Sequence, residues 1–163
     1  MKKIIDLKTG LDYENLKAAN EVAEQEDFSS LVVKFSVDGI LVVDAQGRYT
    51  VWNPVMEKIS GMKKEQVLGR YWLDVFPFFK GTSVEEAFNE TLKGKTIDQP
   101  PHPYEVPETK AQGFTQQRNS PIFNEKNEVI GVLCVVRDVT ESQKQLKRLQ
   151  EENQRLMKEA GTP

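Results

Sequence analysis

Short apolar runs separated by turn residues fill the middle of the chain, and they predict short strands. Ile40–Val43 is a continuous apolar run, the pattern of a strand covered on both faces. Asp44–Gly47 supplies turn residues directly after it, with Gly47 free to adopt positive φ. Arg48–Trp52 is therefore predicted to return as an antiparallel partner.

A second group of strands is predicted near the end of the chain. Phe114–Phe123 and Val129–Asp138 are the last two, joined by a turn at Asn124–Asn127. The four prolines of residues 98–113 exclude a central strand, because proline cannot donate to a sheet ladder. An edge strand near Tyr104–Val106 remains compatible with them.

Helical patterns lie between and around these strands. Asn53 and Pro54 suit the first positions of a helix that Gly61 ends. Ser83–Glu86 has the spacing of a capping box and opens a longer helix that ends at Gly94. Thr140 and Gln143 repeat that spacing, so a last helix is expected to begin at Thr140.

Two helices are predicted before the first strand. Asp12–Glu26 carries apolar residues on one face. The following segment has Phe28, Leu31, Val32 and Phe35 at i, i+3, i+4 and i+7, which predicts a short amphipathic helix. Its apolar face needs a partner, most simply the sheet that follows.

The element order predicts an α+β fold with an antiparallel sheet. Strands grouped at both ends, with short helices between them, favour this class, and the two ends of the domain are expected to meet within the sheet. We divide the chain into an N-terminal helical flank at 1–37, a domain at 38–139 and a C-terminal amphipathic helix at 140–163.

Composition narrows the functional class. The 163 residues are 38% hydrophobic and 29% charged, which suits one core with exposed charged helices. The net charge of −3 gives no basic footprint for direct nucleic-acid binding. No segment approaches the length of a membrane helix, and the single Cys134 is compatible with a reducing compartment. We therefore expect a cytoplasmic protein that does not enter the membrane.

The order and spacing of several motifs resemble a PAS domain. These motifs are Asp38-Gly39 before a strand, Gly47 at the hairpin, Asn53-Pro54, Ser60-Gly61, Gly69-Arg70, Ser120-Pro121 and Arg137-Asp138-Val139-Thr140-Glu141. The resemblance implies a five-stranded antiparallel sheet that cups a small cavity under short helices. It also implies ligand or cofactor binding in that cavity, or dimerisation, and a relay of state to an attached output domain.

On this resemblance the signalling junction is Asp138 and Thr140. The expected pocket residues are Asn53, Trp72, Tyr104, Arg118, Val132, Cys134 and Val136. Of these, Val132, Cys134 and Val136 share one face of the last strand by alternation. Asn53 and Trp72 also have ordinary capping and core roles open to them, and redox sensing by Cys134 is a minor hypothesis.

The cofactor is not identified by the sequence. The flavin-photoadduct subclass of PAS domains needs a cysteine in the helical region, and residues 61–79 contain none. The best-known heme-binding members use a histidine on the long helix, and Ser83–Lys93 has none. The single His102 lies in the proline-rich stretch and is expected to be a surface loop residue. Covalent flavin adducts and histidine-ligated heme are thus disfavoured, and non-covalent flavin stays open.

The C-terminal helix carries a heptad pattern that predicts a coiled coil. Leu146, Leu149, Asn153 and Leu156 fall in one a/d register. A buried asparagine at an a position favours a parallel pair of helices, so we expect a parallel homodimer. The alternative is a single amphipathic helix packed on its own domain.

Three functions are carried forward. The first is a sensory PAS module that dimerises and passes ligand state to an output kinase or transcriptional domain, in cis or in trans. The second is a ligand-free PAS module that only mediates protein interaction. The third is a small enzyme on a PAS-like cup, which rests on analogy, because no phosphate-binding loop, metal spacing or nucleophile motif is present.

Overall fold

A computed structural model describes residues 28–161, and the chain divides into two units, Met1–Ser36 and Val37–Pro163. In the first unit, residues 28–34 are helical, which confirms the short helix predicted there. The apolar side chains of this segment are exposed, and their packing on the sheet stays a prediction. The predicted helix Asp12–Glu26 lies outside the described residues.

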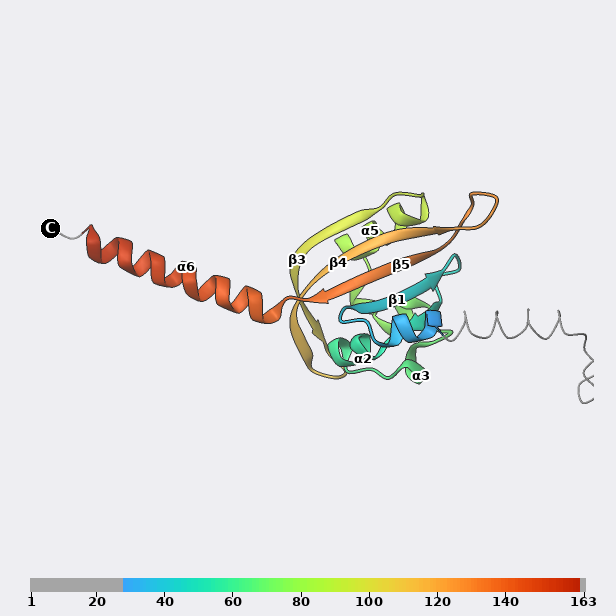
Figure 1. Ribbon diagram of the computed structural model, residues 1–163, viewed down its shortest axis with the longest axis horizontal. Helices are drawn as coiled ribbons and strands as arrows, with labels where there is room; N and C mark the ends of the chain where they lie inside the picture. The colour runs from blue at the N-terminus through green and yellow to red at the C-terminus, as the bar shows by residue number, and fades with distance from the viewer. Residues whose placement is uncertain (1–27, 162–163) are drawn as a thin grey trace, which may run out of the picture. The chain divides into compact units, whose positions relative to one another are not determined.

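The second unit is built on a five-stranded antiparallel sheet with the order β2-β1-β5-β4-β3. β1 and β5, far apart in sequence, pair at the middle of the sheet, as predicted (Figure 1). The predicted α+β class with the strand arrangement of a PAS fold is confirmed. The strands are β1 (Gly39–Asp44), β2 (Tyr49–Trp52), β3 (Ile97–Val106), β4 (Ala111–Phe123) and β5 (Val129–Asp138).

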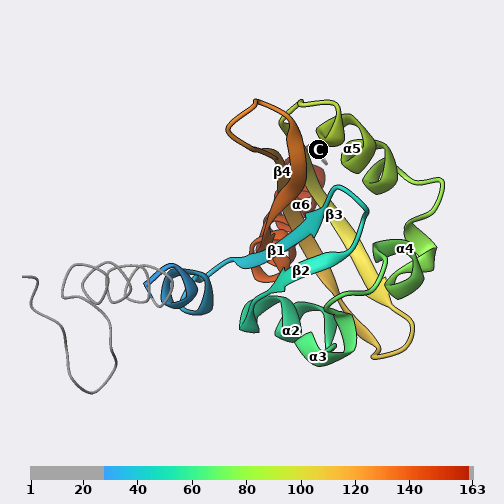
Figure 2. The same cartoon turned by 90° about the vertical axis from the view of Figure 1, so that its right-hand side faces the viewer.

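Short helices connect β2 to β3 and lie on one side of the sheet (Figure 2). The side chains between the two layers form the core, which includes buried Trp52, Val67, Phe76 and Val132. The helices are α2 (Pro54–Ser60), α3 (Lys64–Val67), α4 (Trp72–Val75), the 3-10 helix η1 (Pro77–Phe79), α5 (Ser83–Leu92) and the C-terminal α6 (Thr140–Ala160).

The caps of α2 are those that the sequence predicts. The Asn53 side chain accepts the Met56 N–H at 3.0 Å, and Gly61 ends the helix with a φ of 72°. The prediction for α5 was wrong by one residue. Thr82, not Ser83, has the extended backbone of an N-cap and accepts the Val84 N–H. Two adjacent hydroxyl residues satisfy the same motif, and backbone conformation decides between them.

β3 is the proline-rich stretch, and it is an edge strand longer than the predicted Tyr104–Val106. Its register with β4 shifts between Gln99 and His102, where two prolines intervene. A bulge at an edge accommodates residues that cannot donate to the ladder. His102 consequently lies on a strand, which corrects its expected place in a surface loop.

Candidate functional site

A cavity of about 80 Å³ lies against the face of the sheet that the short helices cover. Aromatic side chains from β2 and η1 form much of its wall, and β3, β4 and β5 supply the rest. The lining residues are Leu41, Tyr49, Trp52, Met56, Ile59, Ser60, Phe76, Phe78, Phe79, His102, Tyr104, Val106, Thr115, Gln117 and Val136.

Polar groups interrupt this apolar wall at a few points. Tyr49 and Thr115 are each only 4% exposed, and Gln117 stands two residues further along β4. Within residues 28–161, the side chains of these three residues form no hydrogen bond. His102 places its Nδ1 3.1 Å from the Pro100 carbonyl oxygen. The cavity thus offers unused hydrogen-bonding groups inside an apolar enclosure.

No Asp, Glu, Lys or Arg is among the described residues that line the cavity. Burial raises the pKa of the Tyr49 hydroxyl, so this group stays protonated. An unpaired charge is costly to bury in such surroundings. The cavity therefore suits a neutral guest.

The structure brings two of the expected pocket residues to the cavity and places three in the surrounding core. Tyr104 and Val136 line it. Val132 and Cys134 share the inner face of β5 with Val136, as alternation predicted, but they pack in the core beside the cavity. Trp72 is also a core residue, with its ring centroid 4.8 Å from that of Phe88.

Two other expected pocket residues have different tasks. Asn53 is 2% exposed, and its Oδ1 accepts the Ile40 N–H at 2.9 Å while its Nδ2 donates to the Asp38 carbonyl at 3.0 Å. It joins α2 to β1. Arg118 points to the opposite face of the sheet and pairs with Asp98 at 3.3 Å. Its expected place in the pocket is corrected, because alternation along β4 sends Gln117, not Arg118, inward.

Cys134 is enclosed by the core. It is 7% exposed, and burial raises its pKa to about 12. The thiol is therefore protonated at neutral pH, whereas reactive cysteines are thiolates in accessible sites. This environment gives no support to the minor redox hypothesis.

Two amide oxygens near α5 also lack partners. Gln99 Oε1 and Asn119 Oδ1 are buried without a hydrogen bond in the described part of the chain. The Gln99 amide donates from Nε2 to the Ser83 carbonyl at 3.1 Å, so this side chain faces the start of α5. The inner face of β3 and β4 is thus more polar than a packed core requires.

The sequence reasoning missed Tyr49, Thr115, Gln117 and His102 as cavity residues. The first three lie on predicted strands, but alternation alone does not find them, because β2 buries residues three apart at Tyr49 and Trp52 and β4 is polar on both faces. His102 was missed because the prolines around it led to the prediction of a loop in place of a strand. Among residues 28–161 no cluster of three or more metal-ligating side chains is present, and no helix there is long and apolar enough to cross a membrane.

The junction between β5 and α6 is fixed by Asp138 and Thr140, but not through the predicted capping box. Asp138 Oδ1 accepts the Thr140 N–H at 2.9 Å, which places a carboxylate at the start of the helix. The Thr140 hydroxyl instead accepts the Phe114 N–H on β4 at 2.9 Å. The hydroxyl is thus used between elements, and the predicted cap with Gln143 is corrected.

α6 carries an apolar stripe without a partner in the described residues. No residue of its 21 is buried. Leu146, Leu149 and Leu156 are 48, 63 and 49% exposed. This arrangement contradicts the alternative in which the helix packs along its own domain.

Comparisons with known proteins agree with this architecture. A protein family described as the PAS fold matches residues 34–144. The chain is 31% identical over 126 residues to the sensor protein kinase WalK of Staphylococcus aureus, a match that covers 77% of the chain. The chain spans only 28% of that relative and 19% of WalK from strain JH9.

Solved structures of low sequence identity share the fold. An RNA-binding light-oxygen-voltage receptor superposes with a TM-score of 0.65 at 16% identity, covering 86% of this chain and 40% of that one. The PAS domain of a protein from Colwellia psychrerythraea superposes with a TM-score of 0.59 at 21% identity, covering 71% and 97%.

Proposed function

The chain belongs to the PAS-fold family, and from that premise we propose that it is a sensory module. In this proposal a small neutral ligand occupies the cavity, and its presence is passed through α6 to an output domain. The observation that carries the proposal is an apolar cavity with unused polar groups, on the same sheet whose central strand β5 leads directly into α6.

The cavity limits the class of ligand. Sites for drug-sized ligands and cofactors measure about 300–1,000 Å³. This cavity of about 80 Å³ is far smaller, so as it stands it does not fit a flavin or a heme. A small, largely apolar molecule with one or two hydrogen-bonding groups matches the aromatic wall and the side chains of Tyr49, Thr115 and Gln117.

The output stage is a parallel dimer of α6 helices. α6 has 21 residues, the length of three heptads, and its exposed leucines run from Leu146 to Leu156; a helix of this length gains stability mainly by burying such a stripe. Similarity to a sensor protein kinase supports a kinase as the output partner, in cis or in trans. An enzymatic role for residues 28–161 has no supporting constellation of side chains.

Native mass spectrometry of freshly purified protein tests both parts together. The expected result is a dimer that carries a small additional mass. Val136→Phe places a ring in the cavity and should abolish the added mass, whereas Val135→Phe, on the other face of β5, should retain it. A bare dimer in all three proteins would favour the interaction-only module, and a bare monomer would refute the coiled coil.

A further inference from the structure

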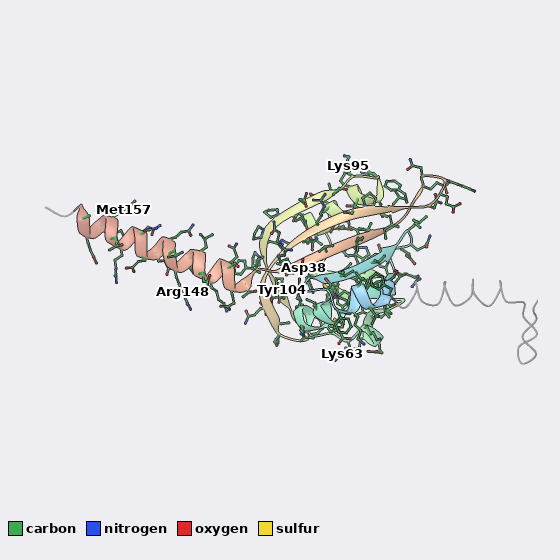
Figure 3. The ribbon with its side chains drawn as sticks, in the orientation of Figure 1. Asp38, Lys63, Lys95, Tyr104, Arg148 and Met157 are labelled. Atoms are coloured by element: carbon green, nitrogen blue, oxygen red, sulfur yellow. The ribbon has the colours of Figure 1, made fainter. Side chains whose placement is uncertain are left out.

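One side chain lies between the cavity and the base of the signalling helix. Tyr104 lines the cavity of about 80 Å³, and it also lines a separate open groove of about 580 Å³ where α6 leaves the sheet. Among the described residues, Tyr104 alone borders both spaces. Figure 3 shows it at the end of the sheet from which α6 extends.

The residue opposite Tyr104 on the neighbouring strand is a glycine, which has no side chain. Gly113 on β4 is the cross-strand partner of Tyr104. A methyl group on Gly113 would overlap the Thr140 hydroxyl, and it would lie 3.1 and 3.3 Å from Cε1 and Oη of Tyr104. The tyrosine ring and the Thr140 hydroxyl therefore both border the space above the glycine, which has no side chain to fill it.

Thr140 is tied to the same part of β4. Its hydroxyl accepts the Phe114 N–H at 2.9 Å, and the adjacent Val139 N–H donates to the Phe114 carbonyl at 2.9 Å. A displacement of the tyrosine ring toward Gly113 would thus press on the residue that holds the first turn of α6. Partial burial and, second to it, the nearby Asp138 carboxylate raise the pKa of Tyr104, and the second cause agrees with this proximity.

We propose that Tyr104 is the positioning residue that couples occupancy of the cavity to the base of α6, through contact with Thr140 over Gly113. The proposal rests on the ligand-binding function above and names the step by which that function reaches the helix. A ligand larger than the cavity must move one of the side chains that line it. Tyr104 is the lining residue that also borders the open groove, so its side chain has space to move.

Benzene is a suitable probe, because an apolar cavity of about 150 Å³ accommodates it in another protein. The cavity here is smaller, so benzene should displace a wall side chain. Amide shifts of the full chain are recorded by NMR with and without benzene. In the parent protein we expect shifts at Ile59 and Val136, which report the cavity, and at Phe114 and Thr140, which report the junction.

Tyr104→Leu tests the coupling. This variant should keep the shifts at Ile59 and Val136 and lose those at Phe114 and Thr140. Phe78→Leu is the matched control, because Phe78 lines the cavity but not the groove, and it should keep both sets. Junction shifts that survive in Tyr104→Leu, or that Phe78→Leu abolishes equally, would overturn the assignment of Tyr104.

Gly113→Ala gives an independent test without any ligand. The added methyl group should displace Thr140, so the Phe114 and Thr140 amides should shift in the direction that benzene produces in the parent protein. Unchanged junction amides would contradict the coupling. If benzene shifts no cavity amide in the parent protein, the ligand-binding function fails; cavity shifts without junction shifts refute the coupling alone.

Discussion

Replacement of Asn53 by alanine tests how the fold attaches its helical layer to the sheet. The Asn53 side chain accepts the Met56 N–H at the start of α2, accepts the Ile40 N–H from β1 and donates to the Asp38 carbonyl. It is 2% exposed, so water cannot replace these bonds without rearrangement. Alanine removes all three bonds together.

The expected loss follows from two contributions. Removing an N-cap costs about 1 kcal/mol. An N–H left without an acceptor costs about a further 1–3 kcal/mol when buried, and the partly buried N–H of Ile40 falls in the lower part of this range. We therefore expect Asn53→Ala to lower the free energy of unfolding by about 2–4 kcal/mol. Urea unfolding followed by the fluorescence of buried Trp52 and Trp72 measures it, with an unchanged slope m as the check on two-state behaviour.

Asn53→Ser is the matched control. Its hydroxyl can still cap α2, but it cannot replace the bonds to both Ile40 and Asp38, so its loss should be smaller than that of alanine by about 1 kcal/mol, the value of the cap. A loss for Asn53→Ala of about 1 kcal/mol or less, the value of a cap alone, would refute the reasoning that this residue joins α2 to β1.

Three further predictions concern the helix, the thiol and one ion pair. Leu149→Asp should shift the protein toward monomer in sedimentation equilibrium, and Asn153→Leu should tighten the dimer or change its order; unchanged mass and stability in both would exclude the predicted register. Cys134 should resist iodoacetamide at pH 8 in the folded protein and react after unfolding in urea, since burial raises its pKa to about 12; rapid alkylation of the native state would contradict its enclosure. Asp38 accepts two bonds from Arg137, at 2.7 and 3.0 Å, and this partner lowers the pKa of Asp38. Because the pKa of Asp38 is lower in the folded than in the unfolded state, the ion pair stabilises the fold fully above the unfolded pKa of about 4, and this stabilisation is lost as the pH falls through the folded pKa. The difference in melting temperature between the parent and Asp38→Asn should therefore shrink below about pH 4. A difference that stays constant with pH would exclude the linkage.

The sequence predicted those parts of the fold where one local choice is strongly preferred. The apolar alternation of Val132, Cys134 and Val136 predicted the inner face of β5. Asn53 before proline predicted the start of α2, because the asparagine side chain and the proline ring suit consecutive positions there. The first pattern depends only on which face of β5 is covered, and the second only on residues adjacent in sequence.

The candidate site was predicted less well, because β4 is polar on both faces. Thr115 and Gln117 lie inward, and Gln116 and Arg118 lie outward, so polarity alone does not show which set faces the cavity. A shift of one residue exchanges the two faces of a strand. The same argument explains why Arg118 was assigned to the pocket while its neighbour Gln117 lines it.

The polar inner face bears on the choice between sensing and simple interaction. An unpaired buried amide oxygen costs about 1–3 kcal/mol, and Gln99 and Asn119 each contribute one in the described residues. A module that served only to hold two α6 helices together would gain stability from apolar residues at these positions and at Thr115 and Gln117. Gln99 and Asn119 do not line the cavity, so a guest in it would not use their oxygens. The groups that a guest would use are the hydrogen-bonding side chains of the cavity wall, Tyr49, Thr115 and Gln117, and these support a ligand in the cavity.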